Sequence, residues 1–97
     1  MRTSTRLKKP GFKLVKLDLN YKDNKIIDIE IKGDFFLYPE EAIEELEKEL
    51  IGEKIEKEKL DRKIDNFFDK NDITPYGINS EIIVEAILNC LKNWTWK

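Results

Sequence analysis

Two stretches in which apolar and polar residues alternate constrain the fold of this chain more than any other feature. In residues 15–21, Val, Leu and Tyr alternate with Lys, Asp and Asn, and in residues 27–32 isoleucine alternates with charged residues. Strict alternation of this kind predicts a β-strand that buries one face and exposes the other. Because only a short polar link separates the two stretches, the sequence predicts an antiparallel hairpin with one apolar face.

The apolar positions also predict how the two strands pair, because residues directly opposite each other in an antiparallel pair share a face. A three-residue loop over residues 22–24 places Leu19 opposite Ile27 and Leu17 opposite Ile29. A two-residue turn within that loop would place Leu19 opposite an aspartate. We therefore expect the three-residue loop, with an asparagine in the left-handed conformation at its end.

An aromatic run follows the predicted hairpin. It consists of Gly33, Asp34, Phe35, Phe36, Leu37 and Tyr38. Gly33 gives the backbone freedom to turn, Asp34 is expected to bond the amides of that turn, and residues 35–38 are expected to form a short third strand. Phe35 and Phe36 then point in opposite directions, so one ring is core and the other is either covered by this chain or offered to a partner. The sequence leaves both outcomes open.

Three amphipathic helices are predicted after the aromatic run. The first begins at Pro39, with acidic residues in its first turn, and ends at Gly52. The second begins at about Glu56, and the third begins at Ser80, an N-cap residue, after a loop over residues 71–79. A hairpin, a short third strand and about three helices predict a two-layer α+β fold in which the helices cover a small antiparallel sheet.

The beginning of the chain differs in composition from the remainder. Residues 1–11 contain two arginines and two lysines but no acidic residue, and they end in Pro-Gly. We predict that this segment is a basic, flexible lead-in, with a phosphate-binding arm as the alternative. Residues 12–97 are then expected to form a single domain.

The composition excludes most catalytic chemistry. The chain has no histidine, and its one cysteine, Cys90, lies four residues after Ala86 on the apolar stripe of the third helix. Core packing of Cys90 is therefore predicted rather than a reactive thiol. The acidic run between Glu40 and Glu58 has the spacing of a solvated helix surface, and no glycine-rich phosphate loop is present. We expect no catalytic, cofactor-binding or metal-binding residue in this chain.

Charge and hydropathy also limit the partners. Eighteen basic and twenty acidic residues give a net charge of −2, so we expect neither nucleic-acid nor membrane binding. No segment approaches the roughly 18 consecutive apolar residues of a membrane span. A single cysteine without a disulfide partner fits a reducing compartment, so we expect a cytoplasmic protein.

Three segments together resemble a known family. Their sequences are KKPGFKLVKL (8–17), IEIKGDFF (29–36) and PEEAIEELE (39–47). In this order they are similar to the C-terminal accessory domain of lipoate–protein ligases. The resemblance covers most of the chain and is closest over residues 11–52. It implies an α+β fold and a non-catalytic accessory subunit.

The resemblance also implies a partner. In that family a large domain uses ATP and Mg²⁺ to convert lipoate to lipoyl-adenylate and then transfers the lipoyl group to a lysine of a carrier domain. In some archaea and bacteria the large and small domains are separate polypeptides, so the expected partner here is a catalytic subunit. Gly33, Asp34, Phe35, Phe36 and Tyr38 are the candidate contact residues. Two alternatives remain: a sulfur-transfer or iron–sulfur assembly accessory protein of the same fold, and a stand-alone interaction domain.

Overall fold

The computed structural model describes the backbone of residues 1–95 and the side chains of residues 1–91. Along this part of the chain the elements are β1 (Arg2–Leu7), β2 (Val15–Lys22), β3 (Lys25–Gly33), β4 (Phe36–Tyr38), α1 (Ala42–Leu50), α2 (Lys57–Lys70), β5 (Thr74–Tyr76) and α3 (Ser80–Thr95). The strands β1, β2 and β3 form an antiparallel sheet in that order, and β4 pairs with β5 in a separate two-stranded ribbon.

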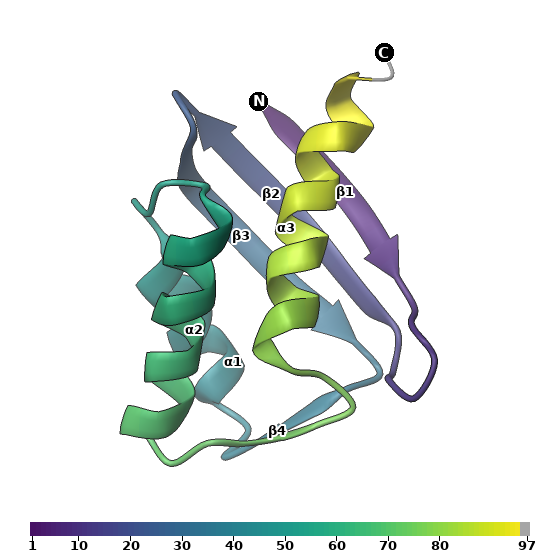
Figure 1. The fold of residues 1–97 in the computed structure, drawn as a ribbon, viewed down its shortest axis with the longest axis vertical. Coiled ribbons are helices and arrows are strands. Elements are labelled where there is room, and N and C mark those ends of the chain that lie inside the picture. Colours follow the sequence, from purple (N-terminus) through teal and green to yellow (C-terminus); the bar gives the residue numbers. More distant parts are fainter. Residues whose placement is uncertain (96–97) are drawn as a thin grey trace.

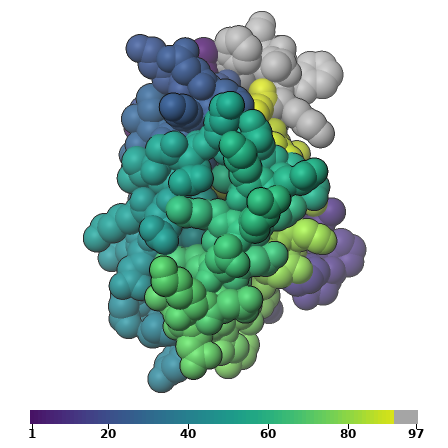
Figure 2. All heavy atoms as spheres, turned by 60° about the vertical axis from the view of Figure 1, so that its left-hand side comes forward, coloured from purple at the N-terminus to yellow at the C-terminus, as the bar shows by residue number. Residues whose placement is uncertain are grey.

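The helices lie on one face of the three-stranded sheet, so the domain has two layers (Figure 1). The helix α3 packs on β1 and β2, α1 packs on β3, and α2 contacts both other helices. In a view from the side, α1 and α2 form the outer surface of the helical layer (Figure 2). The two-layer α+β architecture predicted from the sequence is confirmed. Among the described residues, no helix is long and apolar enough to cross a membrane.

The core forms where the alternating face of the sheet meets the helices. Val15, Leu17 and Leu19 of the central strand β2 are at most 1% exposed and belong to one apolar cluster. From α3 the buried residues in this cluster are Ile82, Ile83, Val84, Ala86, Ile87 and Cys90. Thr3 Oγ1 donates a hydrogen bond of 3.0 Å to the carbonyl oxygen of Cys90, which ties β1 to the same helix.

The pairing of β2 with β3 differs from the predicted pairing. Leu19 lies opposite Ile29, and Leu17 lies opposite Ile31, so the expected partners were wrong by two residues. The apolar faces still match, because a shift of two residues keeps every side chain on its face.

A β-bulge explains how a two-residue turn preserves the matched faces. Asp23 and Asn24 both have positive φ, 53° and 62°, as in the type I′ turns that join hairpin strands. The register then shifts at Asn20 and Tyr21, where one additional residue is accommodated on β3. That residue is Ile27, which is 45% exposed. The expected three-residue loop is therefore wrong. The turn has two residues, and the extra residue in the bulge, rather than a longer loop, brings the apolar residues of the two strands onto the same face.

The expected flexible lead-in is also corrected. Residues 2–7 form β1, which pairs with β2 from Arg2 opposite Asn20 to Leu7 opposite Val15. Every second residue of this strand is half-buried under α3. Two of these residues are threonines, so the strand lacks the alternation of apolar and polar residues that would predict it from the sequence. The third strand of the sheet is thus β1 and not the aromatic run.

Residues 36–38 of the aromatic run form β4, so the strand predicted over residues 35–38 begins one residue later. β4 pairs with β5, which lies within the segment that was expected to be a loop. Two helix starts also differ. The helix α1 begins at Ala42 rather than at Pro39, and α3 is capped by Asn79, whose Oδ1 accepts a hydrogen bond of 2.9 Å from the Ile82 amide, rather than by the Ser80 side chain. Asparagine is as good an N-cap residue as serine, so local preference did not distinguish the two.

The outer edge of β3 is closed by α1 and the segment after it. The Ile31 amide donates a hydrogen bond of 2.7 Å to Glu47 Oε2. Burial raises the pKa of the Glu47 carboxyl above its ordinary value; the hydrogen bond from Ile31 offsets part of this effect, and neighbouring carboxylates add to it. An acceptor on this edge leaves fewer unpaired amides for another strand to bind.

The raised pKa of Glu47 predicts how the free energy of unfolding depends on pH. The charged carboxylate of Glu47 is less favourable in the folded than in the unfolded protein. The contribution of Glu47 to the free energy of unfolding is therefore fully present below its ordinary pKa of 4.5, and it is lost as the pH rises through the pKa of the folded protein. Glu47→Gln stays neutral and can still accept the Ile31 hydrogen bond. Its stability relative to wild type should therefore increase between about pH 4 and about pH 7 in urea titrations.

The control for this experiment is Glu49→Gln, which removes one negative charge from an exposed position of the same helix. If the difference between Glu47→Gln and wild type stayed constant over this range, or matched that of the control, the assignment of the raised pKa to Glu47 would be wrong.

Candidate functional site

The β4–β5 ribbon lies at one end of the molecule, where Figure 1 labels β4. It carries a cluster of exposed aromatic side chains. Phe36 lies opposite Tyr76, and their ring centroids are 6.0 Å apart. Tyr38 shares their face because side chains two residues apart on a strand point the same way. Phe36, Tyr38 and Tyr76 are 43%, 64% and 55% exposed, whereas Leu37 between them is buried. We call Phe36, Tyr38 and Tyr76 the aromatic face.

Lys13 and Leu14 anchor both strands of the ribbon at one of its ends, where β4 begins and β5 ends. The Asp34 amide donates a hydrogen bond of 3.0 Å to the Leu14 carbonyl before β4, and the Lys13 amide donates one of 2.9 Å to the Gly77 carbonyl after β5. Gly33 and Gly77 have positive φ, 152° and 77°, and a Cβ atom at either position would overlap Leu14 or Lys13. Both glycines are therefore required for the close approach that holds the ribbon in place.

The five residues predicted as a site have different environments. Phe35 is half-buried and packs against the core, whereas Phe36 is exposed. Asp34 contributes its backbone amide, and its exposed carboxylate makes no hydrogen bond to the described residues, unlike the role expected for it. The fully buried side chain of the run is Leu37, and Tyr38 lies on the exposed side.

Sequence reasoning missed one member of the aromatic face and its anchor. Tyr76 lies in β5, a Thr-Pro-Tyr segment followed by glycine, which is typical of a loop. Proline is tolerated in an edge strand, and threonine and tyrosine are strand formers, so this segment did contain a weak signal for a short edge strand. Nothing in the local pattern of Lys13 and Leu14 indicated that they would contact the backbone beside both strands of the ribbon.

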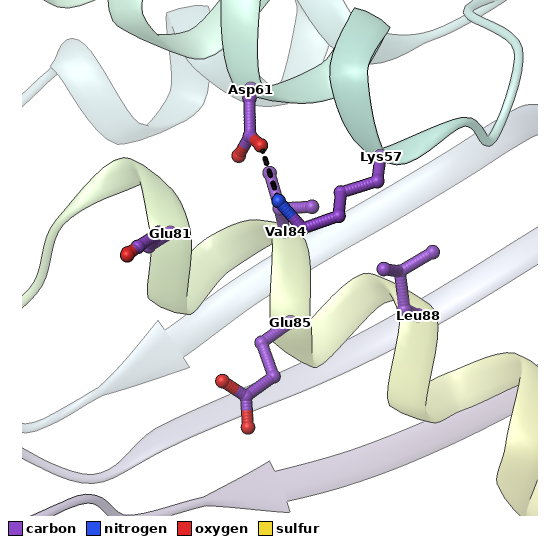
Figure 3. Close-up of a pocket in the computed structure, with 6 residues that line it drawn as sticks. All are labelled: Lys57, Asp61, Glu81, Val84, Glu85 and Leu88. Atoms are coloured by element: carbon purple, nitrogen blue, oxygen red, sulfur yellow. Dashed lines mark hydrogen bonds and ion pairs between the residues drawn. The ribbon is translucent and has the colours of Figure 1, made fainter.

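A shallow groove of about 270 Å³ lies between α2 and α3 (Figure 3). Its lining residues are Lys57, Asp61, Glu81, Val84, Glu85 and Leu88. Lys57 Nζ donates a hydrogen bond of 3.0 Å to Asp61 Oδ2, which raises the pKa of Lys57. The groove is smaller than typical small-molecule sites of roughly 300–1,000 Å³ and holds no paired nucleophile and base. Among the described residues, no cluster of metal-ligating side chains is present.

Comparisons with known proteins identify the family. A family model described as "Bacterial lipoate protein ligase C-terminus" matches residues 5–91. The chain belongs to this lipoate protein ligase family. The matched region contains the whole aromatic face together with Lys13, Leu14 and both ribbon glycines.

Two relatives refine this assignment. The chain is 39% identical over 74 residues to the lipoate-protein ligase A subunit 2 of Thermoplasma acidophilum, and the match covers 76% of each chain. It is also similar to a chain in the solved structure of an archaeal lipoylation system from the same organism, a bipartite lipoate protein ligase and its E2 lipoyl domain. That match has a TM-score of 0.77 and 34% identity, and covers 89% of this chain and 93% of the other.

The cysteine of this ligase domain is buried, as its place on the apolar stripe predicted. The Cys90 thiol is fully inaccessible and approaches the Leu17 carbonyl at 3.8 Å. Burial, with a smaller contribution from the charge of Asp18, raises the pKa of Cys90 to about 12. Because the thiolate is the reactive form, Cys90 is protonated and inert at neutral pH.

Gly33→Ala should destabilise the domain strongly, because the added methyl group would overlap the Leu14 carbonyl in a backbone conformation that L residues rarely adopt. We expect a loss of more than about 3 kcal/mol in the free energy of unfolding, measured by urea titration. The control is Gly52→Ala, which also has positive φ but open space around the added methyl group. It should cost only about 1–2 kcal/mol. Equal losses in the two variants would contradict the close approach at Leu14.

Cys90 should react slowly with iodoacetamide in the native protein at neutral pH and rapidly in urea, because only unfolding exposes its thiol. Cys90→Ala should lower the free energy of unfolding by about 1 kcal/mol, through the loss of a small core group. Mass spectrometry follows the alkylation. Labelling of the folded protein at the rate of a free thiol would contradict a buried, protonated Cys90.

Proposed function

We propose that this chain is the non-catalytic accessory subunit of a two-part lipoate–protein ligase. It binds a separate catalytic subunit and supports the ATP-dependent formation of lipoyl-adenylate, before the lipoyl group passes to a lysine of a carrier domain. In this proposal the sites for ATP, Mg²⁺ and lipoate belong to the catalytic subunit, and this chain binds none of them. Family membership and the likeness to chains of a bipartite ligase support the assignment.

The aromatic face is the observation on which the proposal rests. Exposed phenylalanine and tyrosine rings are enriched in protein interfaces and among the residues that dominate binding energy. Here three such rings share one side of a ribbon whose two strands are both anchored, at one end, to residues 13–14. An anchored ribbon loses little conformational freedom on binding, which favours its use as a docking surface.

The chemistry of the described residues fits an accessory role. The one thiol is buried and protonated, and the groove between α2 and α3 contains an ion pair with no nucleophile beside it. Activation of a carboxylic acid by ATP requires groups that position and neutralise phosphates, so a partner has to supply them. A cytoplasmic location is part of the proposal, since the chain carries a single unpaired cysteine and the reaction uses ATP.

The burial of Cys90 argues against the sulfur-transfer alternative, because a sulfur acceptor needs an accessible, activated thiol. A stand-alone interaction domain would use the same aromatic face with a different partner. The test therefore measures the ligase reaction itself and not only binding.

Phe36→Ser and Tyr76→Ser should each abolish most of the support for lipoyl-adenylate formation. Because the rings are about half exposed, both variants should fold, which circular dichroism checks. Truncating a central interface aromatic costs about 2 kcal/mol or more, so binding to the catalytic subunit should weaken at least about 30-fold. Calorimetry measures the binding, and pyrophosphate release measures adenylate formation.

Ile27→Ser is the matched control, because Ile27 is a similarly exposed apolar residue at the hairpin bulge, outside the aromatic face. It should bind and support the catalytic subunit as wild type does. Folded Phe36 and Tyr76 variants with wild-type binding and wild-type adenylate formation would refute the aromatic face as the docking surface.

A further inference from the structure

The face of the three-stranded sheet opposite the helices carries a row of three basic residues. Arg6 on β1 lies opposite Lys16 on β2, which lies opposite Lys32 on β3. All three side chains are exposed. Because neighbouring strands are about 4.8 Å apart, the row is roughly 10 Å wide. We call Arg6, Lys16 and Lys32 the basic row.

The basic row is unfavourable for the sheet that carries it. Like charges directly opposite each other weaken an antiparallel pair, and Asp18 and Glu30, two residues away on the same face, offset part of this effect. Lys32 is partly neutralised by Glu30 on its own strand at 3.4 Å. Among the described residues, no acidic side chain lies within 4.0 Å of the charged groups of Arg6 or Lys16. Such an arrangement is expected where a partner supplies the countercharges.

The basic row lies where β1 and β3 end and β2 begins. In Figure 1 these strand ends are at the same end of the molecule as β4. Lys32 immediately precedes Gly33, and Lys16 follows the anchor residues Lys13 and Leu14 by two positions. Lys8 and Lys13, in the loop between β1 and β2, add further positive charge. A molecule bound at the basic row would therefore lie at the same end of the domain as a protein bound at the aromatic face.

We propose that the basic row is the docking surface for an acidic face of the protein that accepts the lipoyl group. This inference rests on the proposed function, in which the catalytic subunit occupies the aromatic face. The acceptor would then be held next to the catalytic subunit while its lysine is modified.

The shape of the surface favours a protein over a small anion. The row lies across the open side of a sheet, whereas the described grooves lie among the helices and their termini. Small phosphate ligands are bound in concave sites that enclose them. A row about 10 Å wide on an open sheet suits the spaced carboxylates of a protein surface better.

The polarity of the surface favours the acceptor over the catalytic subunit. Stable subunit interfaces are largely apolar, and the aromatic face has that character. Charged surfaces without apolar side chains accelerate encounter and allow rapid release. The acceptor must bind and leave in every catalytic cycle, so it is the partner that such a surface fits.

The test uses this chain reconstituted with its catalytic subunit and measures the two steps separately. The combined variant Arg6→Glu and Lys16→Glu should leave pyrophosphate release in the absence of acceptor unchanged. The KM for a recombinant E2 lipoyl domain as the acceptor should rise at least about tenfold, and its dependence on salt concentration should become weaker. Lys22→Glu, at the opposite end of β2, is the control and should behave as wild type.

The outcomes separate this inference from the proposed function. An unchanged acceptor KM would overturn the inference, and so would a loss of adenylate formation, because the row would then contact the catalytic subunit. Failure of the proposed function would instead appear in the adenylate step of the aromatic-face variants. Arg6→Gln with Lys16→Gln provides a second, milder variant if charge reversal impairs folding, and it should raise the acceptor KM in the same direction.

Discussion

The burial of β2 beneath α3 is the interaction on which the rest of the domain depends. β2 is the central strand, so both β1 and β3 are ordered by pairing with it. Its Leu17 carbonyl meets the thiol of Cys90 on α3, 73 positions later in the chain. Because the helices cover only one face of the sheet, this contact also determines which residues stay in water. The polar residues of all three strands then form the open face that carries the basic row.

The position of the aromatic face also depends on β2. Lys13 and Leu14 lie directly before β2 and contact the backbone just before β4 and just after β5, at one end of the ribbon. Gly33 and Gly77 make these contacts possible, because any side chain there would overlap Lys13 or Leu14. Core packing and presentation of the aromatic rings are therefore coupled: a change that displaced the beginning of β2 would also displace the ribbon.

The aromatic face and the basic row differ in polarity, and each suits a different kind of partner. The aromatic face suits a stable partner, because burying rings on an anchored support gives binding energy at a low entropic cost. The basic row suits a partner that arrives and leaves, because exposed charge changes association rates more than affinity. In the proposed function, this subunit contributes to the ligase reaction through these surfaces, and the catalytic subunit supplies the reacting groups.

The sequence by itself determined the elements whose signal is local. Alternation predicted β2 and β3, apolar stripes predicted the three helices, and the place of Cys90 on such a stripe predicted its burial. The motif around Gly33 indicated both the turn and the family. Tertiary structure alone decided the pairing of β1 with β2, the pairing of β4 with β5, and the bulge that sets the hairpin register. Each of these depends on hydrogen bonds between separate segments or on a one-residue shift, and local propensity and periodicity carry no information about which distant backbone is available to pair.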